Sequence, residues 1–142
     1  MTEVHLSGDR TVGRLIKWLR AMGLDVSLSE APIPERLHLT RRRSLLKKPG
    51  VLVFWADRVE EQIKELFRQC PQLKAQMRPF SRCLRCNSLL VPAKRDEVFG
   101  LVPDFIYETH SSFFRCPDCG RIYWPGGHRR RMERRLKDYL PS

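Results

Sequence analysis

The sequence predicts a mixed α/β domain that is followed by a small metal-stabilised ribbon and a basic terminal helix. In the first half of the chain, short apolar strand-like runs alternate with helical apolar spacing, which is typical of an α/β domain. Two Cys-x-x-Cys pairs, separated by twenty-nine residues, stand in the second half. Two segments rich in arginine and lysine carry most of the net charge of +11.

The first expected elements are a strand over residues 4–6 and an amphipathic helix. Asp9 follows the strand at the point where the chain turns. From residue 12 to residue 22, apolar residues recur at the i, i+3, i+4 and i+7 positions of one helix face. Gly23 is expected to end this helix. Three basic residues form a stripe on its outer side: Arg14, Lys17 and Arg20.

Two further strands are expected over residues 24–28 and 36–40. Only seven residues, with Pro32 and Pro34 among them, separate these strands. Parallel pairing of successive strands normally requires a crossover of a dozen or more residues, usually a helix. Because two prolines do not fit inside such a helix, we expect the crossover helix to be absent.

The next strand is predicted by the uninterrupted apolar run of residues 51–56, which is typical of a strand buried on both faces. Asp57 ends the run and begins a helix, and Glu60 completes a capping-box-like start. Apolar residues form the inner stripe of this helix: Val59, Ile63, Leu66, Phe67 and Cys70. Pro71 stops it. Cys70, the odd cysteine, is expected to act as a small hydrophobic residue.

The two cysteine pairs predict a zinc site. Each Cys-x-x-Cys turn places two sulfur atoms on one side of a tight knuckle, and two knuckles supply the four soft ligands of a tetrahedral Zn²⁺ ion. The ligands are Cys83, Cys86, Cys116 and Cys119. Four cysteines leave no open coordination position, so the site is structural. Asn87 and Gly120 follow the pairs, where a positive φ is expected. The alternative is two disulfides or four unrelated thiols.

The ribbon is expected to hold short strands around these knuckles. The candidate strands are residues 89–91, 105–107, 113–115 and 122–124. Gly126 and Gly127 then break the chain before a last helix. The apolar side of that helix is formed by Met132, Leu136, Tyr139 and Leu140. We therefore place one domain over residues 1–78 and a second, comprising the ribbon and the basic helix, over residues 79–142.

Positive charge is concentrated in residues 41–48 and 129–137. Each segment has a net charge of +5, so together they account for ten of the eleven net charges. Such clusters are the footprint of a polyanionic partner and indicate nucleic acid. The alternative is that they are solvated faces. No run of about eighteen apolar residues occurs. We therefore expect no membrane association and a cytoplasmic location.

Four stretches resemble a known family. They are VGRLIKWLRAMG (residues 12–23), LTR (39–41), RCLRCN (82–87) and CPDCGRIYWPGGH (116–128). They are similar to the Mut-seven C-terminal RNase family, and the resemblance covers almost the whole chain. It implies a PIN-like three-layer sandwich, here truncated at one crossover, joined to a zinc ribbon. It also implies a ribonuclease site in which acidic residues at the carboxyl ends of parallel strands hold Mg²⁺ or Mn²⁺.

The acidic site of this chain departs from the family pattern. Asp9 matches the first acid, and Asp57 stands where the family often has another. The family's second acid would fall near the missing crossover, where only Glu30 or Glu35 could take its place. The third is the aspartate of the family's Leu-Thr-Arg-Asp motif, and this chain has Arg42 at that position. Two-metal hydrolysis needs several carboxylates around cations about 3.5–4 Å apart. An arginine at this position favours phosphate instead.

Several of these residues have a second interpretation. Asp9 and Asp57, the candidate catalytic residues, are also placed to cap helix amino termini. His128 matches a histidine of the family, with a local hydrogen-bonding role as the alternative. Tyr123 and Trp124 are candidates for base stacking, with one of them facing the core. Trp18 and Trp55 are interpreted as core or interface residues.

The sequence thus predicts an RNA-binding PIN-like protein with a structural zinc ribbon, weak or inactive as a ribonuclease. The expected phosphate contacts are Arg14, Lys17, Arg20, Arg41, Arg42, Arg43, Lys47, Lys48, Arg129, Arg130, Arg131, Arg134 and Arg135. The first alternative is an active metal-dependent ribonuclease that uses Asp9, Asp57 and one of Glu30 or Glu35. The second is a protein–protein adaptor whose positive charge serves an acidic partner in a larger complex.

Overall fold

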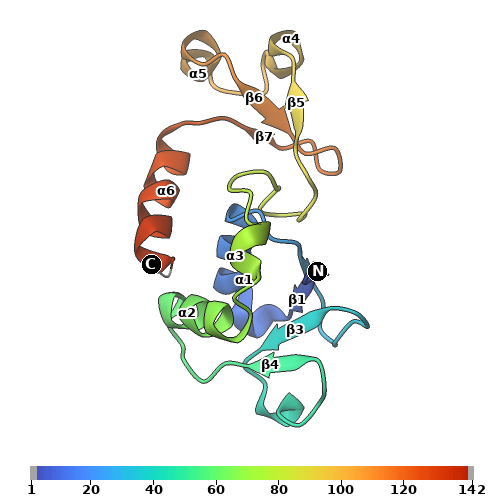
Figure 1. The fold of residues 1–142 in the computed structure, drawn as a ribbon. Helices are drawn as coiled ribbons and strands as arrows, with labels where there is room; N and C mark the ends of the chain where they lie inside the picture. The colour runs from blue at the N-terminus through green and yellow to red at the C-terminus, as the bar shows by residue number, and fades with distance from the viewer. Residues whose placement is uncertain (1–2, 141–142) are drawn as a thin grey trace.

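The computed structural model describes residues 3–140. The first half contains β1 (Leu6–Gly8), a 3-10 turn (Arg10–Val12), α1 (Gly13–Ala21), β2 (Val26–Leu28), β3 (Leu37–Thr40), a second 3-10 turn (Arg43–Leu45), β4 (Val51–Val53), α2 (Val59–Gln69) and α3 (Leu73–Gln76). The second half contains β5 (Val91–Ala93), α4 (Arg95–Val98), α5 (Asp104–Thr109), β6 (Phe113–Arg115), β7 (Ile122–Tyr123) and α6 (Gly127–Tyr139). Figure 1 shows a parallel sheet and a ribbon at opposite ends of the molecule, with α6 running alongside.

The amino-terminal strands form a four-stranded parallel sheet in the order β2-β1-β3-β4. The predicted mixed α/β class is therefore confirmed. The link of residues 29–36 connects β2 and β3 on opposite sides of β1, and it contains no helix, as expected. Because all four strands are parallel, their carboxyl ends lie at one edge of the sheet. Asp9, Glu30 and Arg42 follow three of these ends.

The fourth strand differs from the prediction. Residues 51–56 were expected to form a strand buried on both faces. The strand is present as β4, but it covers only residues 51–53, and all three are half-buried, so full burial on both faces is wrong. β4 is an edge strand with β3 as its only neighbour in the sheet. The cap expected at Asp57 is also wrong. Helix α2 starts at Val59 with Arg58 at the N-cap position and no side-chain cap. The Asp57 carboxylate therefore lies one residue too early to accept the first helical N–H groups.

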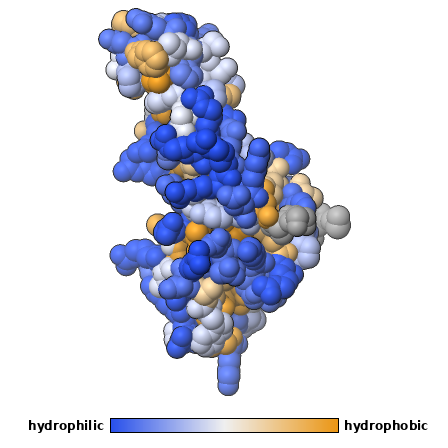
Figure 2. Space-filling view, turned by 90° about the vertical axis from the view of Figure 1, so that its left-hand side faces the viewer, coloured by the Kyte–Doolittle hydropathy of each residue, from blue (hydrophilic) through white to orange (hydrophobic). Residues whose placement is uncertain are grey.

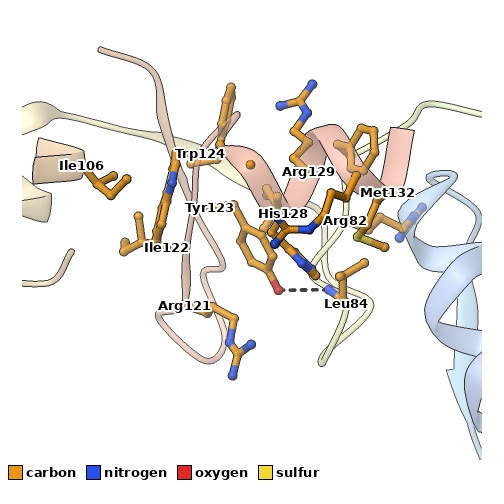
Figure 3. A pocket seen from close by; sticks show the side chains of 16 residues that line it. Arg82, Leu84, Ile106, Arg121, Ile122, Tyr123, Trp124, His128, Arg129 and Met132 are labelled. Atoms are coloured by element: carbon orange, nitrogen blue, oxygen red, sulfur yellow. Dashed lines mark hydrogen bonds between the residues drawn. The ribbon is translucent and has the colours of Figure 1, made fainter. Parts of the chain in front are cut away.

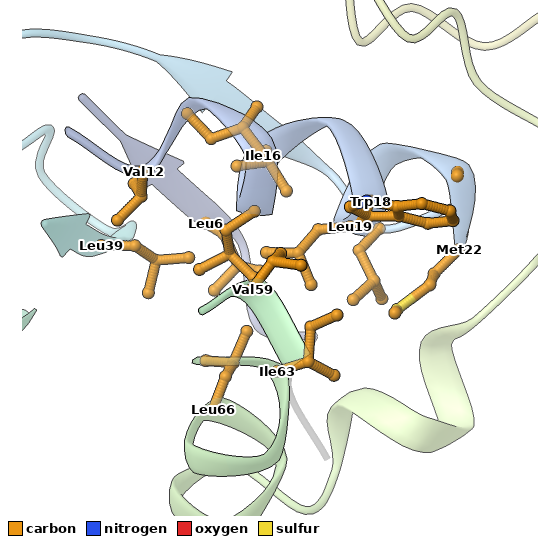
Figure 4. Close-up of a cluster of buried hydrophobic side chains, with 14 of the residues drawn as sticks. Leu6, Val12, Ile16, Trp18, Leu19, Met22, Leu39, Val59, Ile63 and Leu66 are labelled. Carbon is orange, nitrogen blue, oxygen red and sulfur yellow. The ribbon is translucent and has the colours of Figure 1, made fainter. Parts of the chain in front are cut away.

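One hydrophobic core joins the sheet to α1 and α2 (Figure 4). Leu6 of β1 and Leu39 of β3 meet Leu19 of α1 and Ile63 of α2, and all four side chains are fully buried. Burying one such side chain is worth about 1.5–3 kcal/mol, so these contacts supply much of the stability of a small domain. The opposite face of the sheet carries polar residues, because side chains alternate along a strand.

The last helix packs back onto this core. Met132 and Leu136 of α6 are buried in the same cluster, and Leu140 packs against it. Tyr139 meets Trp18 of α1 edge-on, with 5.1 Å between ring centroids. This geometry is favourable for an aromatic pair. The predicted apolar side of the helix and the core position of Trp18 are both confirmed.

The ribbon contains a three-stranded antiparallel sheet in the order β5-β6-β7. A small second core, which includes Val98 and Phe113, lies beneath it. The strand predicted at residues 105–107 is wrong, because these residues lie in α5. Pro103 fixes a φ that suits a helix start, and Asp104 places a carboxylate at the positive end of the helix dipole.

The basic stripe predicted on α1 is only partly correct. Arg14 and Lys17 are exposed, but Arg20 is 7% exposed. The Arg20 guanidinium donates to the carbonyl oxygens of Val26 and Leu84, at 3.0 Å in each case. The prediction that Arg20 contacts RNA is therefore wrong, because its donors are used to join α1, β2 and the first cysteine knuckle.

Asp25 is the centre of a second connection between the sheet and this knuckle. Its carboxylate pairs with Arg36 at 3.0 Å and accepts a hydrogen bond from Asn87 Nδ2 at 2.7 Å. The Nδ1 atom of His5 lies 2.9 Å from Oδ2. Burial alone raises the pKa of Asp25, but the hydrogen bonds with Arg36, Asn87 and His5 outweigh this effect and lower it to about 2.

This pKa predicts a pH-dependent contribution of Asp25 to stability. A carboxyl group with a lowered folded-state pKa stabilises the protein above its unfolded pKa of 3.8, and the contribution is lost as the pH falls toward 2. We expect Asp25→Asn to lower the free energy of unfolding by about 2 kcal/mol at pH 7. The difference should shrink to roughly half by pH 3.

Urea unfolding at both pH values measures this difference. Asp57→Asn changes the same chemical group at an exposed position and serves as the control, with no expected effect at either pH. Equal destabilisation by Asp25→Asn at pH 7 and pH 3 would show that the charge of Asp25 is not the stabilising feature.

Candidate metal centre and acidic site

The four predicted zinc ligands converge. The Sγ atoms of Cys83, Cys86, Cys116 and Cys119 all lie within 4.8 Å of one another. The Sγ atoms of Cys83 and Cys119 are 3.8 Å apart. A tetrahedron with Zn–S bonds of about 2.3 Å has edges of about 3.8 Å. All four cysteines are free thiols, which rules out the disulfide alternative. The donor set therefore fits a tetrahedral thiophilic ion such as Zn²⁺.

The two knuckles have matching backbones. The N–H of Asn87 donates to the Cys83 carbonyl at 2.9 Å, and the N–H of Gly120 donates to the Cys116 carbonyl at the same distance. Their φ values are +70° and +78°, which confirms the predicted positive φ at both positions. The N–H of Cys86 also points at Cys83 Sγ, 3.4 Å away. The backbone thus holds each sulfur pair in position.

Neighbouring groups stabilise the thiolate form of Cys83. The Tyr123 hydroxyl lies 3.2 Å from Cys83 Sγ and accepts a hydrogen bond from the N–H of Leu84 at 3.1 Å (Figure 3). Burial raises the pKa of the Cys83 thiol, but the hydrogen bonds from Tyr123 and from the N–H of Cys86 lower it to about 7. Since the thiolate is the form that ligates metal, these contacts suit a metal site.

At the carboxyl edge of the parallel sheet, Asp9 is fully buried. Its Oδ1 atom accepts hydrogen bonds from the N–H of Thr11, at 2.9 Å, and from the Thr11 hydroxyl. Its Oδ2 atom accepts a hydrogen bond from the Thr40 hydroxyl at 2.6 Å. Burial raises the pKa of Asp9, but these hydrogen bonds and the charge of Arg42 hold it below its usual value. Asp9 also caps the first 3-10 turn, as its second interpretation predicted.

Arg42 lies between Asp9 and Glu30. Its Nε atom is 3.6 Å from Asp9 Oδ2, and its Nη2 atom is 2.5 Å from Glu30 Oε2. Glu30 also pairs with Arg10 at 2.9 Å. The hydrogen bond from Arg42 is the main reason that the pKa of Glu30 is lowered. A guanidinium group thus links the two carboxylates at the carboxyl edge of the parallel sheet.

The other candidate acids do not complete a metal site. Asp57 and Glu35 are exposed, and Glu35 has a φ of +69°. Within residues 3–140, the four cysteines form the only group of three or more histidine, cysteine, aspartate or glutamate side chains close enough to share an ion. Asp9, Asp57 and either glutamate are therefore not brought together as a set of three ligands.

A buried polar row behind Asp9 was missed by the sequence analysis. His38 Nδ1 lies 2.9 Å from Ser7 Oγ, and His38 Nε2 lies 3.5 Å from Asp9 Oδ2. All three side chains are fully buried, so the row is not accessible to a substrate. The sequence does contain a signal for this polar row. Side chains alternate along a strand, so His38 and Thr40 face the same side of the sheet as each other.

Apart from Arg20, the predicted phosphate-contacting residues lie at the surface. Arg129 is half-buried, and the exposed ones are Arg14, Lys17, Arg41, Arg42, Arg43, Lys47, Lys48, Arg130, Arg131, Arg134 and Arg135. Hydrophilic residues dominate the face of the molecule shown in Figure 2. Trp55 is 59% exposed, so it is not a core residue. The guanidinium carbon of Arg43 lies 4.4 Å from the centre of the Trp55 ring.

A pocket of about 550 Å³ lies between β7 and the start of α6 (Figure 3). Its lining comes from residues between positions 80 and 132, so no local sequence pattern indicates it. His128 lines this pocket and is exposed, far in sequence from the acids of the parallel sheet. Trp124 lines it as well and packs against the second core.

Comparison with protein families identified one match. The Mut7-C RNAse domain matches residues 5–136, which is nearly the whole chain. Comparisons with curated proteins and with solved structures gave no match. No helix within residues 3–140 has the length and apolar character needed to cross a membrane.

The thiolate geometry predicts one tightly bound Zn²⁺ ion per chain. We expect Cys116→Ser to abolish zinc binding and to unfold the ribbon, because metal-binding free energy is folding free energy in such small modules. Cys70→Ser is the matched control, since Cys70 lies outside the cluster, and it should keep full zinc content. Elemental analysis of protein purified without added metal gives the stoichiometry. A well-folded wild-type ribbon without metal would contradict the prediction.

Proposed function

This chain belongs to the Mut7-C RNAse domain family, and we propose that it is an RNA-binding member with weak or no ribonuclease activity. The position of Arg42 carries the proposal. Its guanidinium contacts both Asp9 and Glu30 at the edge of the sheet where acids would hold Mg²⁺ or Mn²⁺. One positive side chain therefore neutralises the carboxylates on which metal-assisted hydrolysis depends.

The surroundings of Asp9 support the same conclusion. Both of its oxygen atoms already accept hydrogen bonds from Thr11 and Thr40. Mg²⁺ requires close oxygen ligands in near-octahedral geometry. A divalent ion at this edge would have to displace Arg42, and it would then find at most Asp9 and Glu30 as protein carboxylates. Two carboxylates without a third ligand group support metal binding poorly.

The proposal includes the PIN-like architecture implied by the family. We assign residues 1–78 to a PIN-like sandwich that is truncated at one crossover, and residues 79–142 to a zinc ribbon with a basic helix. Four parallel strands with one helix-free link support the first assignment. A cytoplasmic location belongs to the proposal as well, because disulfides are rare there and this chain carries two Cys-x-x-Cys pairs suited to metal.

The proposed RNA surface includes the basic segment of residues 41–48 beside the acidic site. Its exposed cations would contact phosphates, which position RNA without reading its sequence. Trp55 adds an exposed aromatic ring, already covered on one side by Arg43. Bases stack on such rings with little sequence preference. The exposed arginines of α6 would supply a second track of phosphate contacts.

A protein-binding role is the second candidate function. Three large apolar side chains are exposed on the ribbon around α4 and α5: Phe99 at 70%, Leu101 at 65% and Phe105 at 70%. Clustered exposed apolar residues mark protein contact surfaces in many soluble proteins. This observation fits an adaptor that docks its ribbon on a partner and uses its positive charge elsewhere.

The proposal predicts no cleavage of single-stranded or structured RNA above background in Mg²⁺ or Mn²⁺. Saturating Mn²⁺ should also leave the free energy of unfolding of the zinc-loaded protein unchanged, because an ion that binds only the folded state would raise it. Gel analysis of labelled RNA measures cleavage, with an active ribonuclease as the positive control. Mn²⁺-dependent cleavage that disappears in Asp9→Asn would establish the active-enzyme alternative.

The basic segments predict salt-dependent RNA binding. Each phosphate contact lowers the logarithm of affinity by about 0.7–0.9 per tenfold rise in salt, so about five contacts give a slope near −4. We expect Arg41→Glu with Arg43→Glu to weaken binding and to flatten the slope by one or two units. Fluorescence anisotropy at several salt concentrations measures both quantities.

The matched control is Lys64→Glu with Lys74→Glu, which makes the same change in net charge at exposed positions on α2 and α3. This control should leave the slope nearly unchanged. If both double variants weaken binding equally, the positive charge acts only through the net charge of the protein. If neither affects RNA binding but the first one abolishes capture of a protein partner, the adaptor function is correct.

A further inference from the structure

The pocket between β7 and α6 is lined by apolar and aromatic side chains together with arginines. Its volume of about 550 Å³ lies within the range of small-molecule sites. Aromatic and sulfur-containing side chains form part of its wall: Phe80, Phe114, Tyr123, Trp124 and Met132. Four arginines also line it: Arg82, Arg121, Arg129 and Arg131. No aspartate or glutamate is among the lining residues, so the pocket favours an anion.

Two of these arginines are available to a ligand. Arg82 already donates to the carbonyls of Gly23 and Asn87, and Arg129 pairs with Glu133 at 3.2 Å. Arg121 and Arg131, in contrast, are exposed, and within residues 3–140 neither forms an ion pair. The first turn of α6 also faces the pocket through Gly127 and His128 (Figure 3). Its first N–H groups add positive potential there.

Trp124 supplies the aromatic wall. Its indole packs against the second core, which fixes its orientation. Gly126 keeps the backbone close to the indole: a Cβ atom at this position would lie 2.7 Å from Trp124 Nε1. The Phe80 ring is less available, because the Arg129 guanidinium covers it at 4.7 Å from the ring centre. A planar ligand therefore finds an aromatic surface at Trp124, with arginines in the lining of the same pocket.

We propose that this pocket binds one unpaired nucleotide of an RNA strand. The base packs against Trp124 and the apolar wall, and its phosphate lies between Arg121 and Arg131. A purely apolar ligand would not use these cations, and a peptide with only acidic side chains would not use the aromatic wall. The inference rests on the proposed RNA-binding function and adds a defined position where one base leaves the strand and is held.

Two variants of α6 separate this pocket from general electrostatics. Arg131 and Arg135 are both exposed and lie one helical turn apart, but only Arg131 lines the pocket. Arg135→Glu should weaken binding of a short single-stranded RNA about threefold through charge alone. Arg131→Glu should weaken it about tenfold or more, because the held nucleotide is also lost. Equal losses of affinity in the two variants would overturn the pocket proposal, while the proposed RNA-binding function would still stand.

The indole N–H resonances of the three tryptophans provide a direct readout. Each resonance is assigned with a Trp→Phe variant. Addition of the short RNA should shift the Trp124 resonance and leave that of buried Trp18 unchanged; an unmoved Trp124 resonance overturns the proposal. If the protein binds no RNA, the proposed function fails. A Trp124 shift with a nucleoside monophosphate alone would then identify a free nucleotide as the ligand and overturn the assignment to RNA.

Discussion

The hydrogen bonds between the parallel sheet and the first cysteine knuckle determine how the rest of the molecule is arranged. Arg20 donates from α1 to the knuckle backbone, and Asn87 reaches back to Asp25 and to the N–H of Val26. The same knuckle supplies two of the four sulfur ligands. The metal centre is therefore fixed to the sheet by buried polar contacts, and the ribbon takes its position from the metal centre. Such contacts are worth more inside the protein than at its surface.

At the acidic edge of the sheet, an arginine side chain lies between two carboxylates. Asp9 keeps the backbone role of a cap and remains ionised, and Glu30 stays nearby. Arg42 lies between them and contacts both carboxylates, and Arg10 also pairs with Glu30. The edge thus carries its own cation and is followed by a run of further positive residues at 41–48. A guanidinium at this position can pair with a phosphate as well as with a carboxylate.

The return of α6 to the amino-terminal core creates the pocket. Met132 and Leu136 are buried in the amino-terminal core, while the three residues 124–126 connect the helix to β7. A gap remains where the helix leaves the ribbon, and residues between positions 80 and 132 line it. Two of its four lining arginines, Arg129 and Arg131, project from α6, whose backbone is fixed by its intrahelical hydrogen bonds. Preorganisation of this kind lowers the entropic cost of binding a flexible strand.

The sequence by itself determined the features that depend on local spacing. It identified the four metal ligands, the positive φ at Asn87 and Gly120, the missing crossover helix and the apolar side of the last helix. It did not reveal that Arg20 is buried, that β4 is an edge strand, that residues 105–107 are helical or that Trp55 is exposed. Nor did it show that Arg42 joins Asp9 to Glu30. Only the tertiary structure decided these, because burial and charge pairing depend on neighbours that the chain brings together from distant positions.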